Sequence, residues 1–147
     1  MKRIILAIAL SLSLLSTAYA GIPAAAVRTT DVKDICTTRT STIRDVPEAV
    51  KKQVYRNANI NYGDRTLCTN GYEVDHRISL TLGGTNDISN LQLQAYCTKE
   101  ELAPNFPKGV LYDAHKKDIL ENVLHRDICV GATTPSQAQD QIYNWHN

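Results

Sequence analysis

Residues 72–94 read YEVDHRISLTLGGTNDISNLQLQ, and this stretch decides the fold. Polar and apolar residues alternate from Tyr72, and a second alternating run begins at Leu91, which is the pattern of half-buried β-strands. The Gly-Gly pair between the two runs indicates a tight loop, because glycine adopts backbone conformations that other residues avoid. The stretch therefore predicts a β-hairpin.

The hairpin carries an Asp and a His side by side, Asp75 and His76, and Asn90 opens its second strand. An Asp-His pair, a Gly-Gly loop and an Asn-Leu pair in this order resemble the HNH nuclease family, whose ββα-metal finger adds a helix to such a hairpin. Downstream, residues 114–131 read AHKKDILENVLHRDICVG, which is similar to the KD-x-LEN-x-LH-x-x-x-C pattern of small exported HNH proteins. The resemblance covers roughly the second half of the chain.

This resemblance implies a metal-dependent endonuclease that hydrolyses phosphodiester bonds. His76 would be the general base, because an imidazole of ordinary pKa can take a proton from water near neutral pH. Asp75 would supply an oxygen ligand to Mg²⁺, with Mn²⁺ or Zn²⁺ as alternatives. Asn90 would hold the loop that follows His76, since its amide both donates and accepts hydrogen bonds. The helix residues that compete to complete the metal site are, in order of preference, Asn122, His125 and His115.

Strand alternation offers a competing interpretation of His76. Strict alternation places His76 with Val74 and Ile78 on one face, as a core residue, and turns Asp75 to the opposite face. The nuclease interpretation needs the strand to end or bulge at this pair, so that both side chains reach one ion.

Charge limits how the chain would bind nucleic acid. The sequence has 16 Lys and Arg against 15 Asp and Glu, and removal of Lys2 and Arg3 with a leader leaves 14 against 15. A near-neutral protein would have to bind phosphate through a local patch, and the candidates are Lys108, Lys116, Lys117 and Arg126. Arg77 could also hold a phosphate, or it could pair with Glu73 instead. The expected partner is DNA, with RNA as the alternative, at low sequence specificity; an inhibitor protein is left open.

The N-terminus has the features of a secretory signal peptide. Residues 1–20 combine a basic start, an apolar run and a small-residue ending, which predicts cleavage after Ala20 and a secreted or periplasmic protein that no longer contacts the membrane. Residues 21–35 lack an apolar period and are expected to form a mobile leader. Residues 36–147 are expected to form a single HNH-type domain.

Four cysteines in an exported chain predict two disulfides, for which three pairings exist. A hairpin centred on the Gly-Gly pair would bring Cys68 and Cys97 together, and this leaves Cys36 with Cys129. A zinc site is the alternative use of the cysteines, but the chain contains no Cys-x-x-Cys pair.

The expected fold is α+β: the finger hairpin with flanking helices, held by two disulfides. Helices are predicted from a start near Asp45 to Ala58, from about Asp113 to Ile128, and after Thr134, where a capping box with proline follows. The apolar residues assigned to the buried side of the second helix are Leu111, Ile119, Leu120, Val123, Leu124 and Ile128.

A non-catalytic function is the alternative to the nuclease. The chain would then be a disulfide-stapled HNH-like scaffold that binds a protein or cell-wall partner. Near-neutral charge favours this alternative, and so does the loop, where Ser79 and Thr81 replace a proline and an acid that many HNH proteins carry.

Overall fold

The computed structural model describes residues 21–146 as a mixed α+β fold. The predicted signal peptide, residues 1–20, lies outside the described residues. The main elements are α1 (Val32–Thr37), α2 (Glu48–Asn57), β1 (Tyr72–His76), β2 (Leu91–Ala95), α3 (Ala114–Cys129) and α4 (Pro135–Tyr143). Short 3-10 turns lie at Ala24–Ala26, Thr40–Thr42, Leu80–Leu82, Ile88–Asn90 and Lys99–Glu101.

The predicted hairpin is confirmed. Strands β1 and β2 pair antiparallel, with Tyr72 opposite Ala95 and His76 opposite Leu91. The register is continuous through His76, so the strand does not bulge at the Asp-His pair. Gly84 allows the loop to close, because a Cβ at this position would lie 1.9 Å from the Ile78 carbonyl oxygen.

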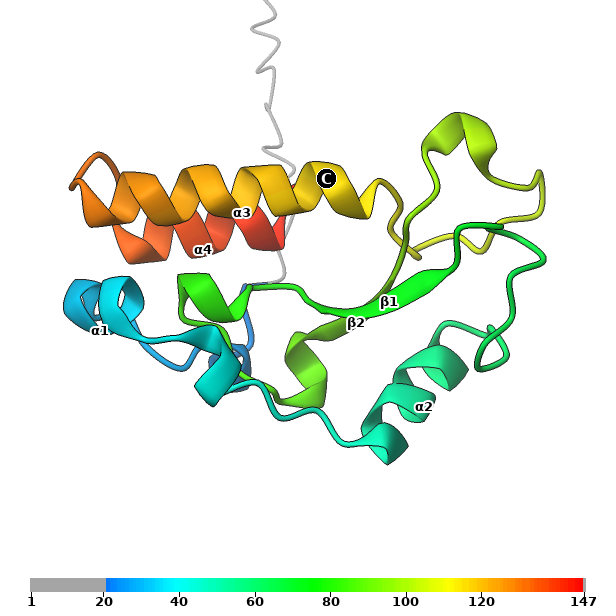
Figure 1. Cartoon of the computed structure of the whole chain (residues 1–147), viewed down its shortest axis with the longest axis horizontal. Helices are drawn as coiled ribbons and strands as arrows, with labels where there is room; N and C mark the ends of the chain where they lie inside the picture. The colour runs from blue at the N-terminus through cyan, green and yellow to red at the C-terminus, as the bar shows by residue number, and fades with distance from the viewer. Residues whose placement is uncertain (1–20, 147) are drawn as a thin grey trace, which may run out of the picture.

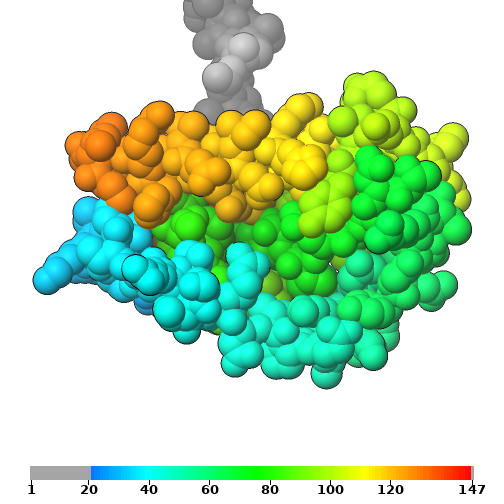
Figure 2. Space-filling view, viewed as in Figure 1, coloured from blue at the N-terminus to red at the C-terminus, as the bar shows by residue number. Residues whose placement is uncertain are grey.

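Helices cover the hairpin from two sides (Figure 1). Helices α3 and α4 run side by side along one side of the hairpin, and α2 lies on the other. In the space-filling view, α3 forms one long edge of the molecule, and segments of α1 and α2 form the opposite edge (Figure 2). The hairpin is therefore the middle layer between two helical layers.

Two apolar clusters correspond to this layering. The first joins the hairpin loop to α1, α3 and α4, and its members are Ala26, Ile35, Ile78, Leu82, Leu124, Ile128, Ala138 and Ile142. The second joins β2 to α2 and the segment before α3, and its members are Val54, Tyr55, Ile60, Leu91, Leu93 and Val110. The hairpin loop and strand β2 thus pack against separate apolar cores.

Both predicted disulfides are confirmed. Cys36 joins Cys129 with a Cα–Cα distance of 5.7 Å, and Cys68 joins Cys97 with a Cα–Cα distance of 5.8 Å. The first bridge ties α1 to the end of α3, and the second ties the two ends of the hairpin. All four cysteines of the chain are paired.

The structure differs from the expectation of a mobile leader at residues 21–35. Asp31 caps α1 by accepting a hydrogen bond from the Asp34 backbone, and Ala26 is fully buried in the first cluster. Val27 forms an isolated antiparallel bridge with Gly84. An apolar period could not reveal this anchoring, because backbone pairing and a helix cap do not depend on a hydrophobic stripe.

The other predicted helices form close to their expected bounds. Helix α2 begins after Pro47, and its N-terminus has no side-chain cap, so Asp45 does not act as one. Thr134 and Gln137 form the predicted capping box of α4, with Pro135 at the first position. From residue 21 to residue 146, every helix is too short or too polar to cross a membrane.

Candidate functional site

A buried lysine lies at the centre of the candidate site. Lys117 projects from α3, is 1% exposed, and donates to Asp75 Oδ2 at 2.6 Å and to the His76 carbonyl oxygen at 2.8 Å. It also pairs with Glu121, one turn further along α3. We call Lys117, Asp75, Glu121 and the His76 carbonyl the Lys117 centre. An ammonium has three donors, and all three are used here.

The charges of this centre hold the lysine protonated. Burial lowers the pKa of Lys117, but the carboxylates of Asp75 and Glu121 outweigh burial, and the pKa lies above its usual value. Burial raises the pKa of Glu121 to about 7, against the opposing effect of Lys117. The centre is therefore a cation held between two carboxyl groups, of which Glu121 exchanges its proton near neutral pH.

His76 faces away from the Lys117 centre. Its ring is 2% exposed, and Nε2 lies 3.0 Å from Asn86 Oδ1. The Asn86 amide nitrogen donates to the Ile43 carbonyl, so Oδ1 is the acceptor and His76 Nε2 carries the proton. Burial lowers the pKa of His76, while the hydrogen bond to Asn86 opposes that shift. A neutral imidazole results, with Nδ1 as the nitrogen able to accept a proton.

Asn90 makes the contacts expected of a residue that holds the loop. It is fully buried, its Oδ1 accepts from the Ile78 backbone, and its Nδ2 donates to the carbonyls of Ile78 and Thr85. Within the same loop, Ser79 and Thr81 hydrogen bond to each other through their hydroxyls at 2.7 Å. The two residues that depart from the HNH pattern thus bond to each other within the loop.

The predicted helix ligands do not meet Asp75. Asn122 and His115 are exposed on α3, and His125 Nε2 lies 3.3 Å from the Ile35 carbonyl and 3.8 Å from Cys129 Sγ. His125 follows Lys117 by eight residues, or about 12 Å along a helix. The side of α3 that faces Asp75 carries Lys117 and Glu121 instead.

The rotation of α3 explains this difference. Ile119 and Val123, assigned to the buried side by their apolar character, are exposed, with Ile119 65% accessible. Lys117 and Glu121 take their place on the buried side because the Lys117 ammonium pairs with both Glu121 and Asp75. Glu121 was missed from sequence, although its i, i+4 spacing from Lys117 is the usual signal of a helical ion pair.

The three predicted substrate-binding residues lie in different surroundings. Lys117 is enclosed in its centre, and Lys116 is exposed and pairs with Asp113 Oδ2 at 2.9 Å. Arg77 lies past the end of β1, with its guanidinium 3.9 Å from the centroid of the Tyr143 ring. Arg77 lines a cavity that also includes Tyr143 and Trp145.

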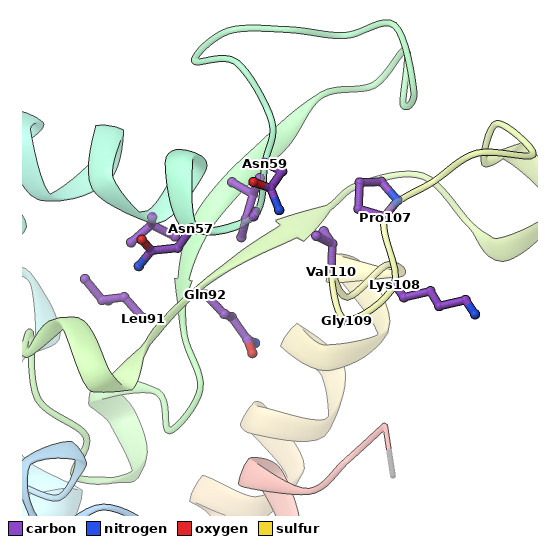
Figure 3. A pocket seen from close by; sticks show the side chains of 11 residues that line it. Asn57, Asn59, Leu91, Gln92, Pro107, Lys108, Gly109 and Val110 are labelled. Carbon is purple, nitrogen blue, oxygen red and sulfur yellow. The ribbon is translucent and has the colours of Figure 1, made fainter.

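Another cavity, shown in Figure 3, lies between α2, β2 and the segment before α3. Asn57 and Asn59 stand on one side of it and Lys108 on the other, while Gln92 leaves β2 in the direction of α3 (Figure 3). No carboxylate is among its lining residues. Its polar lining therefore consists of side-chain amides and one lysine, with no acidic partner for the lysine.

Comparisons with protein-family models, with curated proteins and with solved structures found no match. The site is therefore interpreted from its own geometry.

Proposed function

We propose that this protein is an exported, disulfide-stapled finger scaffold that acts by binding, without a resident divalent metal in its hairpin. The observation that carries this proposal is the saturated Lys117 ammonium, which has no donor left for a substrate. A buried charge with every donor paired is typical of a structural element.

The oxygen atoms of the Lys117 centre do not fit a resident Mg²⁺. Asp75 and Glu121 are oxygen ligands of the right kind, but Mg²⁺ needs near-octahedral oxygen ligands at about 2.0–2.1 Å. The Lys117 ammonium already contacts both carboxylates, so an ion would compete with it for the same oxygens. Over residues 21–146, no cluster of three or more His, Cys, Asp or Glu side chains is arranged to hold a metal ion. The residues therefore do not fit a resident metal while Lys117 stays charged.

A metal-dependent endonuclease acting on DNA or RNA is the second candidate function. The neutral His76 favours it, because Nδ1 could take a proton from water and Asn86 fixes the ring. That function would require Lys117 to leave the centre. The side chains of Asp75 and His76 also point to opposite sides of the hairpin, and both would have to turn toward one ion.

Export is proposed with the scaffold. Two disulfides with no free cysteine suit an oxidising compartment, in which such bridges form and persist. Localisation outside the cytoplasm agrees with the signal-like residues 1–20.

Metal binding and strand cleavage separate the two functions. We expect titration of Mg²⁺, Mn²⁺ and Zn²⁺ into the oxidised protein to give no binding heat that depends on Asp75, and we expect plasmid DNA and single-stranded RNA to stay intact. Asp75→Asn and His76→Ala are the matched variants. Divalent-ion binding that Asp75→Asn abolishes, together with cleavage that His76→Ala abolishes, would overturn the scaffold proposal. Cleavage that is equal in His76→Ala would come from a contaminating nuclease.

A further inference from the structure

A cavity of about 260 Å³ lies beside Arg77, lined by residues of β2, of the segment before α3, of α4 and of the chain that follows α4. Gln92, which lines this cavity, is the cross-strand partner of Asp75, so the cavity borders the Lys117 centre. We call it the Arg77 pocket. Its lining residues include Arg77, Gln92, Leu111, Tyr143, Trp145 and His146, and none of its lining residues is acidic.

Two buried donors at this pocket have no partner. Arg77 Nε and Trp145 Nε1 are inaccessible to solvent, and neither donates a hydrogen bond within residues 21–146. Leaving one buried donor unsatisfied costs about 1–3 kcal/mol, and native proteins rarely do so. Only three buried side-chain polar atoms of the described residues lack a partner, and two of them belong to residues that line this one cavity. The described chain therefore leaves polar groups unpaired at this cavity, and the cavity is the place where an outside ligand would come near them.

The Arg77 guanidinium stacks on a ring and keeps its N–H edge for hydrogen bonds. Tyr143 stacks on one face of it at 3.9 Å, and no carboxylate of the described residues pairs with it. Stacking uses the face of a guanidinium and leaves the N–H groups of its edge for hydrogen bonds. A phosphate offers several acceptor oxygens to such an edge, and Arg binds it in a bidentate manner.

Aromatic rings continue the wall of the pocket. The ring centroids of Trp145 and His146 are 3.7 Å apart. His146 Nε2 donates to the Tyr112 carbonyl at 3.1 Å, and this hydrogen bond fixes the imidazole. Rings beside a phosphate-binding cation are the usual platform for a nucleobase. The cavity is smaller than the roughly 300–1,000 Å³ of a drug-sized site, so its occupant is a single small unit.

We propose that the Arg77 pocket binds a phosphate group that carries a nucleobase, with the guanidinium edge of Arg77 donating to the phosphate oxygens and the Trp145 ring lining the wall beside the base. The unit can come from a free nucleotide or from a single strand of nucleic acid. The inference deepens the proposed scaffold function by naming its ligand. Its test measures binding alone, so failure of the pocket would leave the metal-free Lys117 centre standing.

The chain supplies its own probe, because Trp145 is its only tryptophan. We expect a saturable change in tryptophan fluorescence on titration of the oxidised protein with inorganic phosphate, with a nucleoside 5′-monophosphate and with a short oligothymidylate. The two nucleotide probes should bind more tightly than inorganic phosphate because they add stacking. Acetate and chloride at matched ionic strength serve as controls for other anions.

Arg77→Gln should weaken binding of every phosphate probe by about tenfold or more, which corresponds to about 1.4 kcal/mol. Arg77→Lys keeps the charge but lacks Nε and the planar edge, and it should also weaken binding. Arg126→Gln is the matched control, because Arg126 is exposed on α3 and its loss removes the same charge outside the pocket. Circular dichroism and thermal melting confirm that each variant is folded.

Three results would overturn the proposal: no saturable change with any phosphate probe, an equal response to acetate, or unchanged binding in folded Arg77→Lys and Arg77→Gln. Tighter binding of the oligothymidylate than of the mononucleotide would assign the pocket to a nucleic acid strand. Equal binding of the two would assign it to a free nucleotide.

Discussion

The Lys117 centre and the Arg77 pocket both border one hairpin, yet their hydrogen bonding differs completely. At the centre, the cation donates to three oxygens of the chain itself. At the pocket, a cation and an indole keep buried N–H groups without a partner. Native proteins pair most of their buried polar groups within the chain, and an unpaired one is a rare cost. From this difference we propose a structural role for Lys117 and a binding role for Arg77.

The strongest test of this comparison removes the central cation. Lys117→Ala is expected to lower the free energy of unfolding by about 3–5 kcal/mol, because it leaves the carboxylates of Asp75 and Glu121 buried without a counter-ion. Urea denaturation measures the loss, and divalent cations should restore part of it in the variant. Lys116→Ala, on the exposed side of α3, should cost far less, because water screens an exposed ion pair. Equal losses in the two variants would refute a structural centre.

The next largest effect concerns the loop that follows His76. Asn90→Ala removes three buried hydrogen bonds to the loop backbone and is expected to cost roughly 2–4 kcal/mol. The exposed neighbour Ser89, changed to alanine, is the matched control. Thermal melting of both variants measures the difference, and a loss in Asn90→Ala as small as in the control would show that the loop does not depend on this amide.

A smaller effect depends on pH. Folded Glu121 keeps its proton up to about pH 7, whereas the unfolded chain releases it near pH 4.5, so this group makes the protein less stable as pH rises between those values. The change amounts to roughly 3 kcal/mol, from a pKa shift of about 2.5 at 1.36 kcal/mol for each pKa unit. Glu121→Gln should remove it, while the opposing contribution of His76 remains in both proteins. Urea denaturation at a series of pH values gives the difference, and parallel curves for the two proteins would contradict the prediction.

The smallest effect on stability is expected at Arg77, which sharpens the contrast with Lys117. Arg77→Gln removes a buried donor that has no partner, so the free energy of unfolding should change by no more than about 1 kcal/mol. A phosphate-containing ligand should raise the melting temperature of the wild type but not of the variant. A loss at Arg77 comparable with that at Lys117 would mean that the pocket, too, is mainly structural.

Much of the fold could be predicted because its signals are local. Alternation with a period of two residues identified both strands, and the Gly-Gly pair identified the loop between them. Antiparallel pairing then brought Cys68 to Cys97, which left one partner for Cys36. The same alternation also supports the core interpretation of His76, since the strand runs through it without a bulge.

The candidate site was less predictable because it depends on how α3 is rotated against the hairpin. Each helical residue advances the helix by about 100°, so a small change in orientation exchanges one polar stripe for another. Apolar character favoured Ile119 and Val123 for the buried side, whereas both are exposed. Asn122 and His125 were expected at the metal from the resemblance alone, which does not fix the rotation of the helix.

The sequence by itself determined the hairpin, the loop held by Asn90 and the two disulfides, because these features follow from residues close together in the chain or from strand geometry. Only the tertiary structure decided that Lys117 and Glu121 face Asp75, and that Trp145 and Arg77 share one cavity. The physical reason is distance along the chain: Asp75 and Lys117 are 42 residues apart, and burial of either charge is favourable only once the other is in place.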